Sequence, residues 1–249
     1  MDVKIYSFYN IMLEIKNYTK KYNNDKVAVD NLNLKLEKGD LFAFIGHNGA
    51  GKSTTIKSIV GILPFNEGDI LIDGVSIKEN PVLCKQKLAY VPDNPDVYES
   101  ITGIAYLNLI ADIFKVSKQK RKEIIEKYAN LLNLTNEELN NYISSYSHGM
   151  KQKLVLISAF VHEPKILILD EPFVGLDPTA TYQVKMIMKE FCEQGGAIFF
   201  STHILEVAEK LCNKIAIIKQ GKIVASGSME EVTKDSGLED VFLELTNHA

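Results

Sequence analysis

The residues with the most specific chemistry lie in a glycine-rich segment near residue 50. Residues 46–53 read Gly-His-Asn-Gly-Ala-Gly-Lys-Ser and fit the pattern G-x-x-x-x-G-K-[ST]. Glycines let successive backbone N–H groups converge on phosphate oxygens, and a following helix adds a positive partial charge. Lys52 is predicted to reach the β- and γ-phosphates of a nucleotide, and Ser53 to give its hydroxyl to Mg²⁺. The alternative is a plain glycine turn before a helix. The predicted nucleotide-binding loop consists of Gly46, His47, Asn48, Gly49, Ala50, Gly51, Lys52, Ser53 and Thr54.

Two adjacent carboxylates follow an apolar run later in the chain. Residues 166–169 read Ile-Leu-Ile-Leu, and Asp170 and Glu171 come directly after them. An aspartate at a strand end often serves only as a helix cap, so the pair alone is weak evidence. Together with a phosphate loop, Asp170 becomes a candidate partner of Mg²⁺. Glu171 becomes a candidate to polarise the water that attacks the γ-phosphate in line.

Three further polar residues have roles that the residues alone leave open. Ser147 precedes a helical stretch, where a serine is most often a helix cap. His203 follows a predicted strand, where a satisfied polar residue is commoner than a ligand. Tyr22 is an aromatic residue upstream of the loop, and Tyr18 lies close by. By themselves these residues do not indicate a nucleotide site.

Short apolar runs predict the elements that would position these residues. Leu41–Ile45, directly before the loop, is apolar throughout, as is typical of a strand buried on both faces. Strands are predicted at 13–18, 27–36, 41–45, 70–72, 87–91, 165–169, 197–200 and 214–218. Helices are predicted at 53–63, in four stretches between 94 and 161, and at 178–194. Strands that alternate with helices predict a parallel sheet with helices on both faces.

Composition narrows the class of protein. The 249 residues are 46% apolar and 24% charged, which excludes a disordered chain, collagen and a coiled-coil rod. The net charge of −4 does not give the basic footprint of a general nucleic-acid binder. No run approaches 18 consecutive apolar residues, so no membrane span is expected. Cys84, Cys192 and Cys212 are far apart in the sequence and indicate neither a disulfide framework nor a zinc site.

The order of the motifs resembles that of ATP-binding-cassette (ABC) nucleotide-binding domains over residues 13–227. Residues 146–152, Tyr-Ser-His-Gly-Met-Lys-Gln, stand where that family has its Leu-Ser-Gly-Gly-Gln signature. This variant is similar to the branch that powers separately encoded export-type permeases. Residues 174–177, Val-Gly-Leu-Asp, are similar to the D-loop, and 201–203, Ser-Thr-His, to the segment of the switch histidine.

The resemblance implies roles for the residues that were left open. Ser147 and Gly149 of one subunit would meet the γ-phosphate of ATP held by another. Asp177 would belong to the D-loop at the dimer interface. His203 would contact the γ-phosphate, and Tyr22 would stack on adenine, an interaction worth about 1–3 kcal/mol per base. The catalytic residues are then expected to be Lys52, Glu171 and His203.

One position departs from the family pattern. Asp93 stands where the family has a glutamine, directly after the strand that leads into the helical part. Aspartate can accept a hydrogen bond from a Mg²⁺-bound water, but it is shorter and charged, and a hinge role is the other interpretation. The expected metal-binding residues are Ser53, Asp170 and Asp93.

The resemblance also implies a fold and a domain organisation. The expected fold is α/β: a P-loop NTPase core with a mostly parallel sheet, an antiparallel β subdomain and an inserted α-helical subdomain. A single ABC ATPase domain is expected. Its boundaries are placed at 12–227, with the core at 12–92 and 163–227, the helical insert at 93–162, an N-terminal extension at 1–11 and a short C-terminal tail at 228–249.

The implied function is that of an ATP-hydrolysing motor subunit of a transporter. ATP and Mg²⁺ are the expected cofactors, and a homodimer or heterodimer of cassettes the active unit. The partner would be a separate membrane permease, with the chain peripheral at the cytoplasmic face of the membrane. The signature variant and the short tail favour export. Pro95, Val97, Tyr98 and Ile101 are expected to line a groove for the permease, although they could also pack internally.

A soluble ABC-type ATPase that acts on nucleic acid or ribosomes is the alternative. Relatives of that kind have a long coiled coil between the phosphate loop and the signature, or two cassettes in one chain. Lys52 and Gly149 are too close in the sequence for the first, and a single cassette is present. The basic run at 118–122 is short and is interpreted as a solvated helix turn. No nucleic-acid partner is therefore expected.

Overall fold

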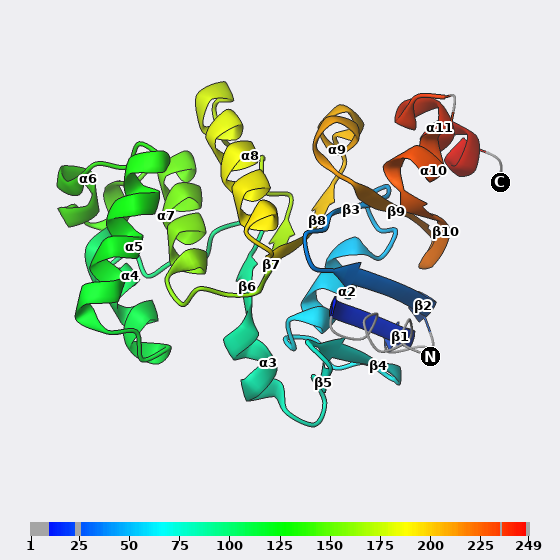
Figure 1. The fold of residues 1–249 in the computed structure, drawn as a ribbon, viewed down its shortest axis with the longest axis horizontal. Helices are drawn as coiled ribbons and strands as arrows, with labels where there is room; N and C mark the ends of the chain where they lie inside the picture. Colours follow the sequence, from blue (N-terminus) through cyan, green and yellow to red (C-terminus); the bar gives the residue numbers. More distant parts are fainter. Residues whose placement is uncertain (1–9, 23–25, 235, 248–249) are drawn as a thin grey trace, which may run out of the picture.

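The computed structural model describes residues 10–22, 26–234 and 236–247. It has the expected α/β fold: a mostly parallel sheet, a smaller antiparallel sheet and a group of helices at one end of the molecule (Figure 1). Most of the expected extension at 1–11 lies outside the described residues. No helix in the described ranges is both long and apolar enough to cross a bilayer.

The main sheet has the strand order β10-β9-β3-β8-β7-β6. Strands β9, β3, β8, β7 and β6 run parallel, and β10 pairs with β9 in the antiparallel direction. The carboxyl ends of parallel strands lie at one edge, which is where α/β proteins bind ligands. The strands are β3 (Leu41–Ile45), β6 (Leu88–Val91), β7 (Ile166–Asp170), β8 (Ala197–Thr202), β9 (Lys214–Lys219) and β10 (Lys222–Ser228).

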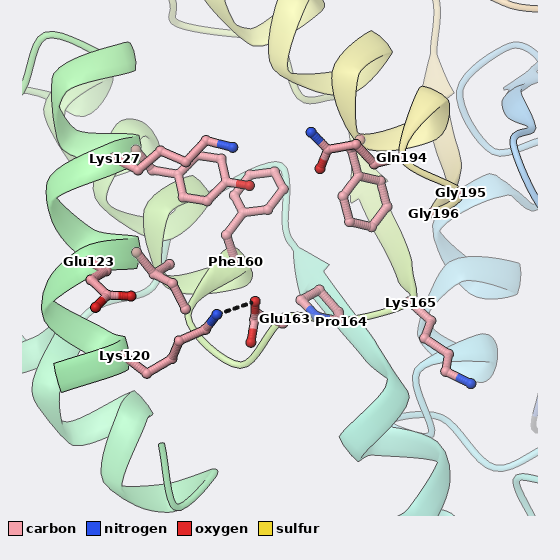
Figure 2. Close-up of a pocket in the computed structure, with 13 residues that line it drawn as sticks. Lys120, Glu123, Lys127, Phe160, Glu163, Pro164, Lys165, Gln194, Gly195 and Gly196 are labelled. Atoms are coloured by element: carbon pink, nitrogen blue, oxygen red, sulfur yellow. Dashed lines mark ion pairs between the residues drawn. The ribbon is translucent and has the colours of Figure 1, made fainter. Parts of the chain in front are cut away.

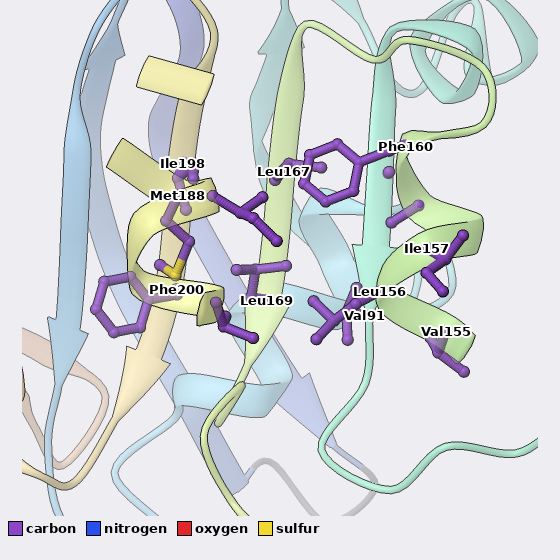
Figure 3. Close-up of a cluster of buried hydrophobic side chains, with 14 of the residues drawn as sticks. Val91, Val155, Leu156, Ile157, Phe160, Leu167, Leu169, Met188, Ile198 and Phe200 are labelled. Atoms are coloured by element: carbon purple, nitrogen blue, oxygen red, sulfur yellow. The ribbon is translucent and has the colours of Figure 1, made fainter. Parts of the chain in front are cut away.

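The central strands are apolar throughout because both of their faces are covered. Leu41, Ala43 and Ile45 of β3 belong to one buried cluster, and the alternating Phe42 and Phe44 belong to another. Figure 3 shows the first cluster, in which side chains of β6, β7 and β8 meet helices α7 (His148–Phe160) and α8 (Pro178–Glu193). The second cluster lies between the sheet, helix α2 (Lys52–Ile59) and the antiparallel sheet.

The antiparallel sheet has the strand order β2-β1-β4-β5. Its first strand extends well beyond the predicted 13–18, and irregularities in its register accompany Asn17, which has a left-handed φ of 47°. The elements of this part are β1 (Ile11–Tyr22), β2 (Lys26–Glu37), β4 (Glu67–Ile72), β5 (Val75–Ser76) and α3 (Pro81–Lys87).

The helical part has a capped helix in each of its main segments. The side chains of Thr102, Ser117, Thr135 and Ser147 each accept a hydrogen bond from the third backbone N–H of the following helix, and the predicted capping box at Thr135 is present. Helix formation begins later than the predicted residue 94, since no helix spans residues 92–102. The elements are α4 (Gly103–Ile113), α5 (Lys118–Leu131), α6 (Asn136–Asn140), the 3₁₀ turn η1 (Ile143–Ser145) and α7.

The C-terminal segment, expected to be a short tail, is folded. Helices α10 (Met229–Thr233) and α11 (Leu238–Asn247) follow β10, and α11 packs against α9 (Leu205–Leu211). A capping box formed by Ser228 and Glu231 starts α10. Leu238 and Phe242 of α11 are buried in the first cluster, so the segment belongs to the core.

Candidate functional site

The phosphate loop joins β3 to α2 at the carboxyl edge of the main sheet. Gly51 has a φ of 115°, a conformation that side chains rarely adopt. At Gly46 a Cβ atom would lie 2.4 Å from the carbonyl oxygen of Ile218. The glycines are therefore required by the backbone conformation and by the close approach of β9.

Lys52 is buried inside this loop. Its Nζ donates a hydrogen bond of 2.6 Å to the carbonyl oxygen of Gly46. Burial lowers the pKa of Lys52, while the carboxylates of Glu171 and Asp170 act in the opposite direction. The structure thus brings the predicted cation and the two predicted carboxylates into electrostatic contact.

A cavity of about 600 Å³ adjoins the loop. Tyr22, which is 44% exposed, lines it together with the loop residues His47, Asn48, Gly49, Gly51, Lys52, Ser53 and Thr54. Tyr18 is fully buried, and its hydroxyl donates to Ser58 Oγ at 2.8 Å. Of the two tyrosines, Tyr22 alone faces the cavity. Four residues that were not predicted as site residues also line the cavity: Lys26, Val27, Ala28 and Gln220.

Asp170 ends β7 beside Ser201 of β8. Ile168 and Phe199, two residues earlier on each strand, belong to the cluster on the α2 side. Because side chains alternate along a strand, Asp170 and Ser201 point to that same side. Ser201 Oγ donates a 2.5 Å hydrogen bond to Asp170 Oδ1.

Glu171 occupies a left-handed conformation with a φ of 48°. Its backbone N–H donates to Ser201 Oγ at 3.1 Å and to the Ser201 carbonyl oxygen at 3.2 Å. Its Oε2 lies 3.0 Å from Nδ1 of His203. The ends of β7 and β8 therefore bring Asp170, Glu171 and His203 together.

The donor set is compatible with Mg²⁺. Within the described residues no group of three or more His, Cys, Asp or Glu side chains could hold a metal by itself. Mg²⁺ usually binds through one or two protein oxygens together with substrate phosphates and water. The carboxylate of Asp170 and the exposed hydroxyl of Ser53 are oxygen ligands of this kind. Asp93 is exposed two residues after β6, at the same sheet edge.

The signature segment and the D-loop contact each other. A Cβ atom on Gly175 would lie 2.3 Å from the ring of His148, and one on Gly149 would lie 3.2 Å from the Gly175 carbonyl oxygen. Ser147 Oγ accepts from Met150 N at 3.2 Å as the cap of α7. The packing of His148 against Gly175 was not predicted.

Asp177 caps α8, since its Oδ1 accepts from Ala180 N at 2.8 Å, and this hydrogen bond lowers the pKa of Asp177. Across the described part of the chain, no hydrogen bond joins Ser147 or Asp177 to the phosphate loop. The structure thus brings Lys52, Asp170, Glu171 and His203 together, and it does not bring Ser147 to them.

Helix α11 is another neighbour of the phosphate loop that the sequence did not indicate. The ring of His47 lies against that of Phe242 in α11, with centroids 5.0 Å apart. A helix predicted as tail thus reaches the predicted nucleotide site.

The apolar segment predicted to line a groove is only partly exposed. Pro95 is buried, Val97 and Ile101 are half-buried, and Tyr98 is 63% exposed. A groove of about 330 Å³ lies nearby, between the core and the helical part. Its lining includes Ile62, Tyr90, Ile110, Phe114 and His162, and none of the four predicted residues.

A separate cavity of about 480 Å³ lies between α5, the end of α7 and the end of α8 (Figure 2). Phe160 and Phe191 line it, and Lys120 forms an ion pair of 3.0 Å with Glu163 across part of it. None of the predicted site residues lines this cavity.

Comparison with known proteins gives one consistent result. The model of the family described as "ABC transporter" matches residues 29–174. The ABC-type transporter ATP-binding protein EcsA of Bacillus subtilis is 34% identical, over 94% of this chain and 96% of its own length. The linearmycin resistance ATP-binding protein LnrL of the same species is 32% identical, over 94% of this chain and 75% of its own length.

Solved structures agree with these relatives. A structure described as the ATP-binding subunit of an ABC transporter superposes with a TM-score of 0.89 at 32% identity, covering 94% of this chain and 99% of its own. A dimeric ATP-binding cassette in a post-hydrolysis state, bound to ADP and phosphate, superposes with a TM-score of 0.80 at 23% identity. It covers 88% of this chain and 99% of its own, and shares the fold.

Proposed function

The chain belongs to the ABC transporter family as an ATP-binding, ATP-hydrolysing subunit, and on that premise we propose that it closes as a nucleotide-bound dimer to power export through a separate permease. The observation that carries the proposal is the convergence at one sheet edge of Lys52, Asp170, Glu171 and His203. These residues come from three strand ends that are far apart in the sequence.

Each side chain of the site has a separate proposed role in binding or hydrolysing ATP. Lys52 binds the β- and γ-phosphates as a buried positive charge. Glu171 accepts a proton from the attacking water at its carboxylate. His203 is hydrogen-bonded to that carboxylate through Nδ1, which leaves Nε2 for the γ-phosphate. Tyr22, at the other end of the cavity, stacks on the adenine ring.

Asp170 and Ser53 are the residues proposed to hold Mg²⁺. When bound, the metal neutralises charge on the β- and γ-phosphates. Asp170 is already oriented by Ser201, so its carboxylate needs little rearrangement to accept the metal or its waters. Asp93 is proposed to accept from a metal-bound water across the same edge.

Ser147, Gly149 and Asp177 are proposed to act on the ATP of a second cassette. Within one chain Ser147 and Asp177 serve as helix caps. The helix N-terminus after Ser147 suits an anionic phosphate group presented from outside. This assignment leaves open whether the second cassette is a copy of this chain.

The groove between the core and the helical part is the proposed docking site for a permease. Ile62 and Ile110 give it an apolar lining, and such a surface commonly marks a partner site. Export is favoured by the signature variant and by the relative LnrL, which is described as a resistance protein. The named relatives are transporter or resistance proteins, so the nucleic-acid alternative receives no support from them.

A pair of exposed isoleucines allows a matched test. Ile62 lines the groove and is 59% exposed, while Ile113 is 64% exposed on α4 and does not line it. The affinity-tagged chain is purified from solubilised membranes of its source, and the membrane proteins that it retains are identified and quantified. Ile62→Arg should lose a multi-spanning partner that the wild type and Ile113→Arg retain. Equal recovery with all three chains contradicts the groove assignment. Transport by inverted vesicles of the complex then tests the direction.

A further inference from the structure

The buried hydroxyl of Ser201 makes contact with both consecutive carboxylate residues of the site. Ser201 is completely buried near the end of β8. It donates to Asp170 Oδ1 at 2.5 Å and accepts from Glu171 N at 3.1 Å. An ionised carboxylate can only accept, so the single hydroxyl proton must point to Asp170, and an oxygen lone pair remains for Glu171. We propose that Ser201 is a positioning residue that fixes the carboxylates of Asp170 and Glu171 relative to each other for ATP hydrolysis.

The conformation of Glu171 explains why such a residue is needed. A glutamate with a φ of 48° is in a region that non-glycine residues avoid, so the turn after β7 requires support. Two hydrogen bonds from Glu171 N to Ser201 provide it. In this turn Glu171 Oε2 lies beside His203, two residues beyond Ser201 on the same strand end. Ser201 thus ties the turn of Glu171 to the segment that carries its hydrogen-bond partner.

The register of the sheet makes Ser201 suited to this task. Ser201 pairs with Asp170 and points to the side of the phosphate loop. Its neighbour Thr202 is also buried, but its hydroxyl accepts from Ile204 N and, within the described residues, forms no hydrogen bond with Asp170 or Glu171. Small errors in the placement of catalytic groups can lower rates about a hundredfold. This inference rests on the proposed roles of Asp170 and Glu171.

The test compares Ser201→Ala and Ser201→Cys with Ser76→Ala. Ser76 is also buried, and its hydroxyl donates to Asp69 Oδ1 at 2.8 Å and accepts from Lys78 N at 3.3 Å in the antiparallel sheet, away from the acidic pair. Ser201→Ala should lower kcat by roughly 10- to 100-fold, with the KM for ATP and the equilibrium affinity for a fluorescent ATP analogue within threefold of wild type. Ser201→Cys keeps a side chain of similar size but with a weak hydrogen-bond donor, so its kcat should lie between those of Ser201→Ala and the wild type. Ser76→Ala should keep wild-type kcat. Thermal unfolding of each variant measures any loss of fold.

A double-mutant cycle separates positioning from a merely structural role. If Ser201 acts through Glu171, Ser201→Ala should change the residual rate of Glu171→Gln by less than threefold, because the group being positioned has already lost its function. An additive loss, or a Ser201→Ala kcat within threefold of wild type, overturns the inference. If Glu171→Gln itself hydrolyses ATP at the wild-type rate, the proposed role of Glu171 fails instead, so the two failures can be distinguished.

Discussion

At the scale of single residues, the protonation of Lys52 depends on the groups around it. It is buried, its pKa is lowered by that burial, and the two carboxylates that oppose the shift are those proposed for hydrolysis. A phosphate group bound in the loop would give the ammonium a further anionic partner and favour its charged form.

Lys52→Ala should weaken ATP binding at least tenfold and abolish hydrolysis. The substitution removes a charge-assisted contact worth roughly 1.5–3 kcal/mol. Titration of a fluorescent ATP analogue measures the first effect and phosphate release the second. An ATPase rate equal to wild type would exclude residues 46–53 as the phosphate loop.

The sequence could predict residues whose chemistry is local. Residues 46–53 are recognisable because residue type and spacing alone define them, and the pair Asp170–Glu171 becomes a candidate once that loop is present. Ser201 was not predicted as a site residue, because its importance comes from the register that sets β8 beside β7. Likewise, Tyr22 rather than Tyr18 faces the cavity because Tyr18 is buried, and the burial of a single aromatic residue cannot be inferred from the sequence.

At the scale of elements, α11 connects the C-terminal segment to the phosphate loop. Phe242 contacts His47, and Leu238 of the same helix is buried without a ring contact to the loop. The N–H of Leu238 donates to Glu209 in α9, close after His203. Helix α11 therefore contacts both the phosphate loop and α9, the helix that follows His203.

Phe242→Ala should weaken ATP binding several-fold and also lower the thermal stability. The loss of a large buried side chain costs about 3–5 kcal/mol, less where the site can collapse. Leu238→Ala should lower the stability by about 2–5 kcal/mol and leave ATP affinity near wild type. Thermal unfolding measures the stability, and titration with a fluorescent ATP analogue measures the affinity. Equal losses of affinity in the two variants would show that the contact of Phe242 with His47 has no specific effect on ATP binding.

His162 links the core to the helical part. Its Nε2 lies 3.1 Å from the Leu88 carbonyl oxygen of β6, and its ring stacks on that of Phe114, directly after α4, with ring centroids 3.8 Å apart. Burial lowers the pKa of His162 below its usual value. The unfolded chain therefore binds a proton more readily than the folded one, so the free energy of unfolding falls as the pH drops below about 6.5 and levels off below the folded pKa.

His162→Gln should flatten this pH dependence. Glutamine can still donate to the Leu88 carbonyl but does not titrate. Denaturant unfolding of both proteins between pH 7.5 and pH 5 gives the two curves. The wild type should lose more stability on acidification than the variant, and parallel curves would show that His162 does not contribute.

Elements with a clear apolar pattern or capping motif were predicted well. Elements whose apolar face is explained only by tertiary contacts were not. The buried strand at 41–45 and the capping box at Thr135 are where the sequence put them. The helical pattern was predicted from about residue 94, but the first helix of this part begins at Gly103. Helix α11 was missed because its buried face depends on its contacts with α9 and α10.

At the scale of the whole molecule, the proposed composite site needs a second cassette, whose signature segment would meet the phosphate loop of this chain. In a trans arrangement, a dimer of a Lys52→Ala chain with a Ser147→Arg chain has both lesions at one composite site and keeps the other intact. A chain with both substitutions, paired with a wild-type chain, damages both sites. The first dimer should therefore hydrolyse ATP and the second should not. Differently tagged, purified heterodimers give the answer, and a cis arrangement reverses the two results.

In the proposed mechanism the chain hydrolyses ATP through Glu171 and closes as a dimer around the nucleotide. Glu171→Gln keeps the size of the side chain but removes the general base, which typically costs 10²–10⁴ in rate. The decisive measurement is phosphate release from this variant alongside size-exclusion chromatography with and without Mg-ATP. For this variant we expect hydrolysis to fall by at least about a hundredfold, ATP binding to be retained, and a dimer to accumulate only with ATP. Hydrolysis at the wild-type rate would contradict it.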